Sequence, residues 1–445
     1  MTDVPVTDVE RAPAEAGPVG PPAAFRVSSW RRPVVLIGAV AAGWLVPLAT
    51  HLLGVDWLVL LAIGVGAAGL LRGGRTVVDR FVLAGTLLVG TTLAAGLVIS
   101  VWPWHLHPVA LGGSGLTGLI VASAALRRRW RLPRWARADT LVAVPAGLFA
   151  LAMCWPFARR DLADRLALMV AGEDGTRHFV MFDTLRRVGG YLFLHRPEAI
   201  GAALRVDLTY PAGSHMLAAV VDSFVTSSTR VGDAAAAQER FLWYQVAAYV
   251  FLGLAVIWSA RRVAGPVADA VTFAPVAGAI VGYLLFGDMI TAFLYGYLPE
   301  ILGLGYLAVL IGIAARPLAR TREQVAVMTA AVVAIGFTYY VALPIAAAAT
   351  LAYAWWYRRR LRRRPWFTAS FVVLGIPLTL LVWYINSADQ SSELLVQRFG
   401  ILPVRLGPVL ALGLLVVAAM ATRSWRRSPA TRTIAIAAET AVAHA

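Results

Sequence analysis

Long apolar runs separated by short arginine-rich segments dominate the chain. A transmembrane helix needs about 17–25 predominantly apolar residues. Such runs lie near 33–55, 57–71, 81–102, 107–126, 140–157, 241–260, 265–287, 297–315, 324–341, 342–357, 366–385 and 401–421, the second and tenth being short. The pattern therefore predicts an all-α polytopic membrane protein with about twelve transmembrane helices.

The arginines between these runs indicate the orientation. They gather in alternate loops, as in Arg72–Arg80, Arg127–Arg137 and Arg358–Arg364. Because positively charged loops stay on the cytoplasmic side, we expect a multi-pass plasma-membrane protein with both termini in the cytoplasm. The arginine-rich loops all fall on the cytoplasmic side only if the apolar stretch 213–228 does not cross the bilayer. We therefore interpret it as a helix that lies on, or dips into, the outer face.

One long polar insert interrupts the apolar pattern between Phe157 and Pro211. Its acidic side chains are Asp161, Asp164, Glu173, Asp174, Asp183, Glu198 and Asp207. Helical spacing is predicted from Asp161 to Val170 and from His178 to Gly189, where glycine ends the second helix. The chain then divides into a disordered cytoplasmic tail (1–30), N-terminal transmembrane helices (31–157), an extracytoplasmic loop with juxtamembrane helices (158–240), C-terminal transmembrane helices (241–422) and a cytoplasmic tail (423–445).

Composition agrees with a membrane protein and narrows the chemistry. Of 445 residues, 59% are hydrophobic and 14% are charged, against about 25% charged in soluble domains. The net charge is +16 and lysine is absent, which excludes lysine Schiff bases and phosphate-loop lysines. The basic charge is spread over loops, so we expect no nucleic-acid partner. Cys154 is the only cysteine, which excludes an intrachain disulfide and a thiolate metal cluster.

The insert holds the residues with the clearest chemical potential. Glu173 and Asp174 are adjacent between Gly172 and Gly175, and the small neighbours allow close approach to the backbone. An ionised carboxylate there suits a general base or a metal ligand, or it simply caps a solvated helix start. His178 follows Asp174 at i+4, so both share one helix face.

Cationic and aromatic residues surround these acids along the chain. Arginine forks bind phosphate in a bidentate manner, although the same side chains also pair with lipid headgroups or with nearby acids. The candidate substrate-binding residues of the insert are Arg177, His178, Arg186, Arg187, His195, Arg196, Tyr210 and His215.

Two further acids, Asp288 and Glu300, flank an aromatic segment between two predicted spans. Ionisable groups at membrane depth are costly and therefore point to a site. The alternative is that both are plain loop residues. A Walker loop, a zinc pattern and a nucleophile-elbow serine are absent from the sequence. No metal ligands are assigned, and a divalent metal stays a possible cofactor.

The order of these motifs resembles the GT-C class of membrane glycosyltransferases over roughly residues 141–320. The segments that carry the resemblance are the acidic motif with His178, then Tyr210-Pro211-Ala212-Gly213-Ser214-His215, then Arg261-Arg262 after a span. The resemblance implies an inverting transfer of a sugar from a polyprenyl-phosphate donor to a glycan or lipid acceptor of the cell envelope. It further implies that Asp174 deprotonates the acceptor, with Glu173 as partner, and that nearby Arg and His hold the donor phosphate.

Two other functions fit the same sequence. A transporter or flippase for a lipid-linked glycan would carry buried ionisable residues and repeated halves, and neither stands out here. A non-catalytic subunit of an envelope-assembly machine would need no cavity at Asp174. Membrane lipids are partners under every one of these hypotheses.

Overall fold

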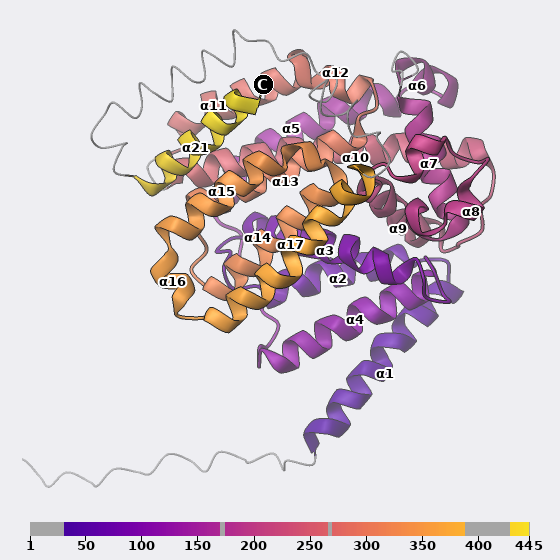
Figure 1. Cartoon of the computed structure of the whole chain (residues 1–445), viewed down its shortest axis with the longest axis horizontal. Helices are drawn as coiled ribbons and strands as arrows, with labels where there is room; N and C mark the ends of the chain where they lie inside the picture. Colours follow the sequence, from indigo (N-terminus) through magenta and orange to yellow (C-terminus); the bar gives the residue numbers. More distant parts are fainter. Residues whose placement is uncertain (1–30, 170–173, 266–268, 388–427, 445) are drawn as a thin grey trace, which may run out of the picture.

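The computed structural model describes residues 31–169, 174–265, 269–387 and 428–444. Regular structure in these residues is helical (Figure 1). The helices before the insert are α1 (Arg31–Leu52), α2 (Trp57–Leu70), α3 (Val77–Ile99), α4 (Pro108–Ala125) and α5 (Arg137–Ala158). The insert forms α6 (Leu162–Met169), α7 (Gly175–Val188) and α8 (Arg196–Ala199), and α9 (Gly213–Thr226) follows it directly. The prediction of an all-α protein is confirmed for this part of the chain.

The second half continues the helical pattern. Its helices are α10 (Ala234–Ala264), α11 (Ala270–Phe286), α12 (Asp288–Leu294), α13 (Leu298–Ala315), α14 (Thr321–Thr338), α15 (Leu343–Trp356), α16 (Arg358–Arg362), α17 (Pro365–Ser387) and α21 (Pro429–His444). Helix α21, in the segment predicted as a tail, packs against α15 and α13. The tail predicted at 1–30 lies outside the described residues.

Seven of these helices are long and apolar enough to cross a membrane: α1, α3, α4, α5, α10, α13 and α17. The predicted span 265–287 corresponds to α11, and the short helix α12 follows it at a bend of 46°, so that this pair counts as an eighth candidate. Helices α2, α14 and α15 exist but do not meet the same test, and the span predicted at 401–421 lies outside the described residues. The protein is therefore a polytopic helical membrane protein, while the number of twelve stays a prediction.

Helix burial separates the centre of the bundle from its lipid-facing rim. In α13, 83% of the span is buried, against 11% in α1 and 17% in α17. Glycines allow the central helices to approach closely, since a Cβ at Gly90 would lie 2.2 Å from the Ala330 carbonyl oxygen. Small residues at helix contacts are typical of membrane bundles, because lipid provides no hydrophobic force between helices.

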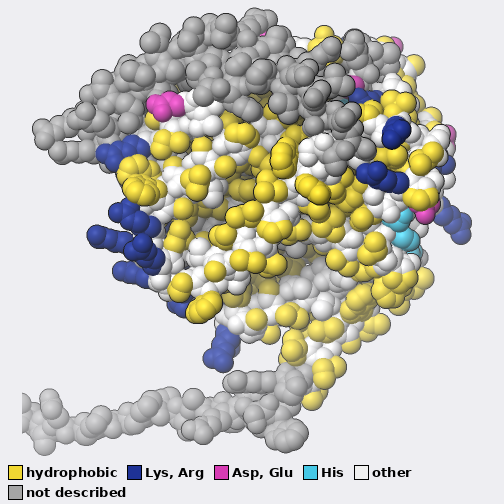
Figure 2. Space-filling model, in the orientation of Figure 1, with side chains coloured by type: hydrophobic (Ala, Val, Ile, Leu, Met, Phe, Trp, Pro, Cys, Tyr) yellow, Lys and Arg dark blue, Asp and Glu magenta, His cyan; other side chains and the backbone are white. Residues whose placement is uncertain are grey.

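The arginine-rich loops meet at one end of the bundle. The Arg128 guanidinium lies 2.5 Å from the Glu323 carboxylate, which also accepts the backbone N–H of Arg72 at 2.8 Å. Arg262 donates to the Arg316 carbonyl at 2.6 Å. Figure 2 shows arginines at one edge of an apolar surface and histidine, arginine and acidic groups at the opposite edge. Loops predicted to share one side therefore do lie together, although the side of the membrane is still a prediction.

The insert contacts loops at the other end of the helices. Ser100, just after α3, accepts the backbone N–H of Tyr191 at 2.8 Å through its hydroxyl. Helix α3 starts beside the arginine-rich loop and has 23 residues, so these ends are about 35 Å apart. The backbone N–H of Asp56, between α1 and α2, donates to the Ser227 hydroxyl after α9 at 3.1 Å. The insert thus closes the end of the bundle opposite the arginines.

Helix α9 lies deeper in the protein than a surface helix. Ten of its fourteen residues are buried, and it packs against α2, α3, α7, α13 and α14. The helix predicted over 213–228 is confirmed, and it places polar residues inside the bundle.

Candidate functional site

Helix α7 positions most of the predicted site residues. It begins after Asp174 and ends at Gly189, whose φ of 77° is left-handed and suits glycine. His178, Phe182 and Leu185 are buried on one face, as their helical spacing predicts. The stop at Gly189 also has a packing reason, because a Cβ there would lie 2.6 Å from the His105 Cβ.

Five side chains from α7, the following loop and α9 form an acid–histidine cluster: Arg177, His178, Asp207, Tyr210 and His215. The His178 Nδ1 and His215 Nε2 atoms are 3.0 Å apart, and their rings stack at 5.0 Å. Arg177 Nε donates to the Asp207 carboxylate at 2.5 Å, and its guanidinium lies 5.6 Å from the centre of the Tyr210 ring.

Burial determines the ionisation of this cluster. Desolvation, followed by the nearby Arg177 charge, lowers the pKa of His178 to about 3. The pKa of His215 is lowered well below its ordinary value by burial, His178 and Arg177. Burial raises the pKa of Asp207, and the Arg177 ion pair opposes that rise. Both imidazoles are therefore neutral at pH 7, so one ring donates an N–H to the bare nitrogen of the other.

Asp174 and Glu300 lie beside the acid–histidine cluster. Burial raises the pKa of the Tyr210 hydroxyl, the Arg177 charge opposes that rise, and the charges of Asp174 and Glu300 add to it. Asp174 is partly exposed and lies 3.9 Å from Arg177, whereas Glu300 is buried in α13. Two acids that are 126 positions apart in the sequence therefore both act on Tyr210. Glu173 lies outside the described residues.

A second group, the arginine–aspartate cluster, is centred on Asp222 of α9. This buried carboxylate lies 2.8 Å from Arg186 Nε and 2.6 Å from Arg240 Nε, and it accepts the Tyr244 hydroxyl at 2.8 Å. The predicted ligands Arg186 and Arg187 also pair with Asp183, at 3.4 Å and 2.8 Å. Their predicted pairing with nearby acids is therefore present, and their role in binding a phosphate stays a prediction.

Sequence reasoning missed Asp222, Arg240 and Tyr244 as site residues. One signal was available: Asp222 is an isolated acid in an apolar helix, and such acids are costly to bury without a partner. Arg240 and Tyr244 are i and i+4 on α10 and so share a face. The partners lie on a different helix from Asp222, which local spacing does not reveal.

The remaining predicted residues lie elsewhere at the insert end. The His195 ring bonds the Ser100 carbonyl through Nε2 at 2.7 Å, which connects the insert to the end of α3. Arg196 is exposed at the first position of α8, and Asp288 begins α12 at the bend after α11. These three residues are not among the side chains that make up the two clusters.

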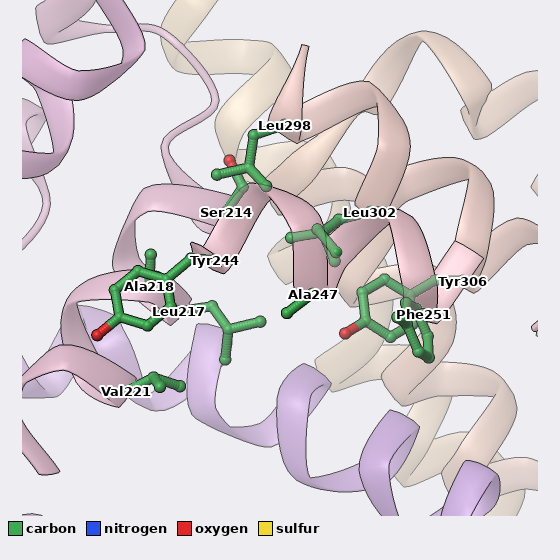
Figure 3. A pocket seen from close by; sticks show the side chains of 11 residues that line it. Ser214, Leu217, Ala218, Val221, Tyr244, Ala247, Phe251, Leu298, Leu302 and Tyr306 are labelled. Atoms are coloured by element: carbon green, nitrogen blue, oxygen red, sulfur yellow. The ribbon is translucent and has the colours of Figure 1, made fainter. Parts of the chain in front are cut away.

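An apolar cavity of about 210 Å³ lies between α9, α10 and α13. In Figure 3, Leu217, Leu298 and Leu302 lie between Tyr244 on one side and Phe251 with Tyr306 on the other. The cavity is connected to both clusters. Tyr244 lines it and donates to Asp222, while Ser214 lines it and places its hydroxyl 3.4 Å from His215 Nδ1.

Among the described residues, no group of three or more His, Cys, Asp or Glu side chains is arranged to hold a metal ion. Comparison with protein-family models, with curated proteins and with solved structures finds no match. The chemistry of the site therefore has to be argued from its own residues.

Proposed function

We propose that the protein is a membrane glycosyltransferase of the GT-C type. It transfers a sugar from a polyprenyl-phosphate donor to a glycan or lipid acceptor at the extracytoplasmic face of the plasma membrane. The observation that carries this proposal is the apolar cavity bordered by two polar clusters. A substrate with an apolar chain, a charged phosphate and a hydroxylated head requires those three environments side by side.

The apolar cavity suits a segment of the prenyl chain. It lies between α9 and the N-terminal halves of α10 and α13, at the insert end of the bundle. Burial of apolar area contributes about 25 cal/mol per Å². A chain bound there extends toward Tyr244 and the arginine–aspartate cluster, so the chain and the phosphate reach adjacent parts of the same site.

The phosphate is assigned to the arginines of the clusters. Arg186, Arg187 and Arg240 face the two carboxylates of Asp183 and Asp222, which leaves an excess of positive charge. Arginine is the side chain best suited to phosphate recognition, because its planar fork donates two parallel hydrogen bonds.

The acid–histidine cluster supports the chemical step. An acceptor hydroxyl attacks the anomeric carbon, and the bond between that carbon and the phosphate oxygen breaks. The proton passes to Asp174, polyprenyl phosphate leaves with the bonding electrons, and the configuration inverts. The positively charged Arg177 guanidinium lies 3.9 Å from the Asp174 carboxylate, the proposed general base. Glu173 is the proposed partner of Asp174.

Transfer of radiolabelled sugar from polyprenyl-phosphate donors in membranes tests this function. Wild type is compared with Asp174→Asn, and Asp164→Asn, in the short helix α6 of the same insert, is the matched control. Loss of a positioned general base lowers the rate by roughly 10²–10⁴-fold. Product from wild type and the control, but not from Asp174→Asn at equal protein level, supports the proposal.

Two outcomes contradict it. Equal product from wild type and Asp174→Asn removes Asp174 from the mechanism. Absence of product from wild type across donors with different sugars and chain lengths removes the transferase, and leaves transport or assembly of a lipid-linked glycan as the function to test.

A further inference from the structure

A small niche with an apolar lining and a few polar groups lies where α6, α7 and α10 meet. Its volume is about 20 Å³, and it is lined by Leu166, Gly175, Thr176, Phe179, Gln238, Phe241, Leu242 and Gln245. A cavity of this size holds one water molecule or one hydroxyl group. The niche adjoins the start of α7, directly after the proposed base Asp174.

Gln245 is an unusual residue within this niche. Its side chain is buried, with 2% exposure, and its Oε1 atom has no hydrogen-bond partner among the described residues. Gln324 provides a contrast, because this fully buried amide accepts from the Leu318 N–H at 2.7 Å and donates to the Ile313 carbonyl at 3.0 Å. A buried acceptor without a partner is costly, so Gln245 is poised for a donor that arrives with a ligand.

The start of α7 also lines the niche. Gly175 and Thr176 occupy the first turn of α7, where backbone N–H groups have no partner within the helix. A hydroxyl group matches both walls, since it donates one hydrogen to Gln245 Oε1 and accepts from a backbone N–H. A carboxylate accepts from the N–H groups of α7 but has no hydrogen to donate to Gln245 Oε1. An ammonium group donates to Gln245 Oε1 but cannot accept from those N–H groups.

A glycine turn packs closely against two residues of the niche. The turn between α12 and α13 covers the start of α7, with Gly296 at φ +82°. A Cβ at Gly296 would lie 2.9 Å from the Gly175 Cα and 3.4 Å from Gln245 Nε2. The turn at Gly296 therefore packs against both Gly175 and Gln245.

We propose that this niche binds one hydroxyl of the sugar acceptor, and that Gln245 is the residue that selects it. The assignment rests on the proposed transferase, because it places the bound hydroxyl beside Asp174. A site built to bond a hydroxyl discriminates strongly against analogues that lack it. Gln245 thus restricts acceptors to those with a hydroxyl adjacent to the reacting one.

Two measurements on the full-length purified protein test the niche without requiring turnover. The first compares thermal unfolding of Gln245→Leu and Gln324→Leu in the absence of ligand. We expect Gln245→Leu to keep or raise the unfolding temperature, because it removes an unpartnered acceptor. Gln324→Leu lowers it, because it leaves a buried N–H and a carbonyl unpaired. An equal loss in both variants overturns the inference, since Gln245 would then have a structural bond.

The second measurement follows the unfolding temperature as the concentration of a glycoside is raised. The three glycosides are methyl α-D-mannopyranoside, methyl β-D-glucopyranoside and methyl β-D-galactopyranoside. We expect at least one to stabilise wild type, an apparent affinity about tenfold weaker in Gln245→Leu, and one within about threefold of wild type in Gln245→Glu, which keeps the acceptor oxygen. If no glycoside stabilises wild type, or if all three proteins bind the glycoside with equal affinity, the proposed hydroxyl site is wrong.

The transfer assay separates this inference from the proposed function. If wild type transfers sugar and Gln245→Leu has an unchanged acceptor KM, the inference fails and the transferase stands. If wild type transfers nothing, the transferase fails, and glycoside binding still decides whether the niche accepts a sugar hydroxyl.

Discussion

Acidification is expected to destabilise the protein through the buried histidine pair. An ordinary histidine has a pKa of 6.5, whereas the pKa of folded His178 is about 3 and that of His215 is also strongly lowered. Below pH 6.5 the unfolded chain takes up protons that the folded pair does not bind. The contribution of the histidine pair to the free energy of unfolding is therefore fully present above pH 6.5. It decreases as the pH falls toward the folded pKa values.

The magnitude follows from the width of that window. Each pH unit between the unfolded and folded pKa values costs about 1.36 kcal/mol per group. From pH 6.5 to pH 5, the neutral His178 lowers the free energy of unfolding by about 2 kcal/mol, and His215 acts in the same direction. Asp207 acts in the opposite direction, because its raised pKa adds stability at low pH that is lost as the pH rises through that pKa.

Unfolding by sodium dodecyl sulfate in mixed micelles, followed by tryptophan fluorescence, measures this effect at several pH values. Wild type is compared with His178→Gln, His215→Gln and the double variant, all of which retain Asp207. We expect His178→Gln to remove about 2 kcal/mol of the loss between pH 6.5 and pH 5, His215→Gln to reduce the loss as well, and the double variant to show the smallest loss. His195→Gln, outside the cluster, is the control. An undiminished acid loss in the double variant refutes the reasoning.

Two further substitutions test the packing of the site. Gly296→Ala is expected to lower the free energy of unfolding by about 1–3 kcal/mol through its left-handed backbone, because φ is +82° and the Gly175 Cα lies 2.9 Å from the added Cβ. Gly278→Ala, with open space around its Cβ, is the control, and equal losses in the two would contradict the packing. Asp222→Asn removes the charge between Arg186 and Arg240 and is expected to cost about 3–5 kcal/mol in the same unfolding assay. A change near zero would show that Asp222 is not the centre of its cluster.

Hydrophobic spacing was sufficient to predict helices such as α7. Its buried face and its end at Gly189 both follow from local sequence, since a 3.6-residue period and a left-handed glycine act within one helix. The run 265–287 predicted α11 as one span, but the short helix α12 after Gly287 and the 46° bend between the two helices were not predicted. Hydropathy reports apolar content and carries no information about the direction of the helix axis.

The candidate site was predicted only in part, because its contacts join distant segments. His178 and His215 were both expected in the site, but their ring contact links positions 37 apart. Arg177 pairs with Asp207 across 30 positions, and no local period encodes that distance. Asp222 and Gln245 can be recognised as site residues only when the burial of their side chains and the hydrogen-bond partners of their atoms are known. The sequence alone does not supply this information.

We infer that the apolar cavity and its two clusters form one site for a lipid-linked phosphate. Photo-crosslinking with a polyprenyl phosphate that carries a diazirine in its chain tests this inference, with the labelled peptides identified by mass spectrometry. We expect labels on α9, α10 and α13 that are lost in Leu302→Trp, which fills the cavity, and retained in Leu374→Trp on the exposed face of α17. Labelling confined to α1 and α17, or labelling unchanged by Leu302→Trp, would contradict it.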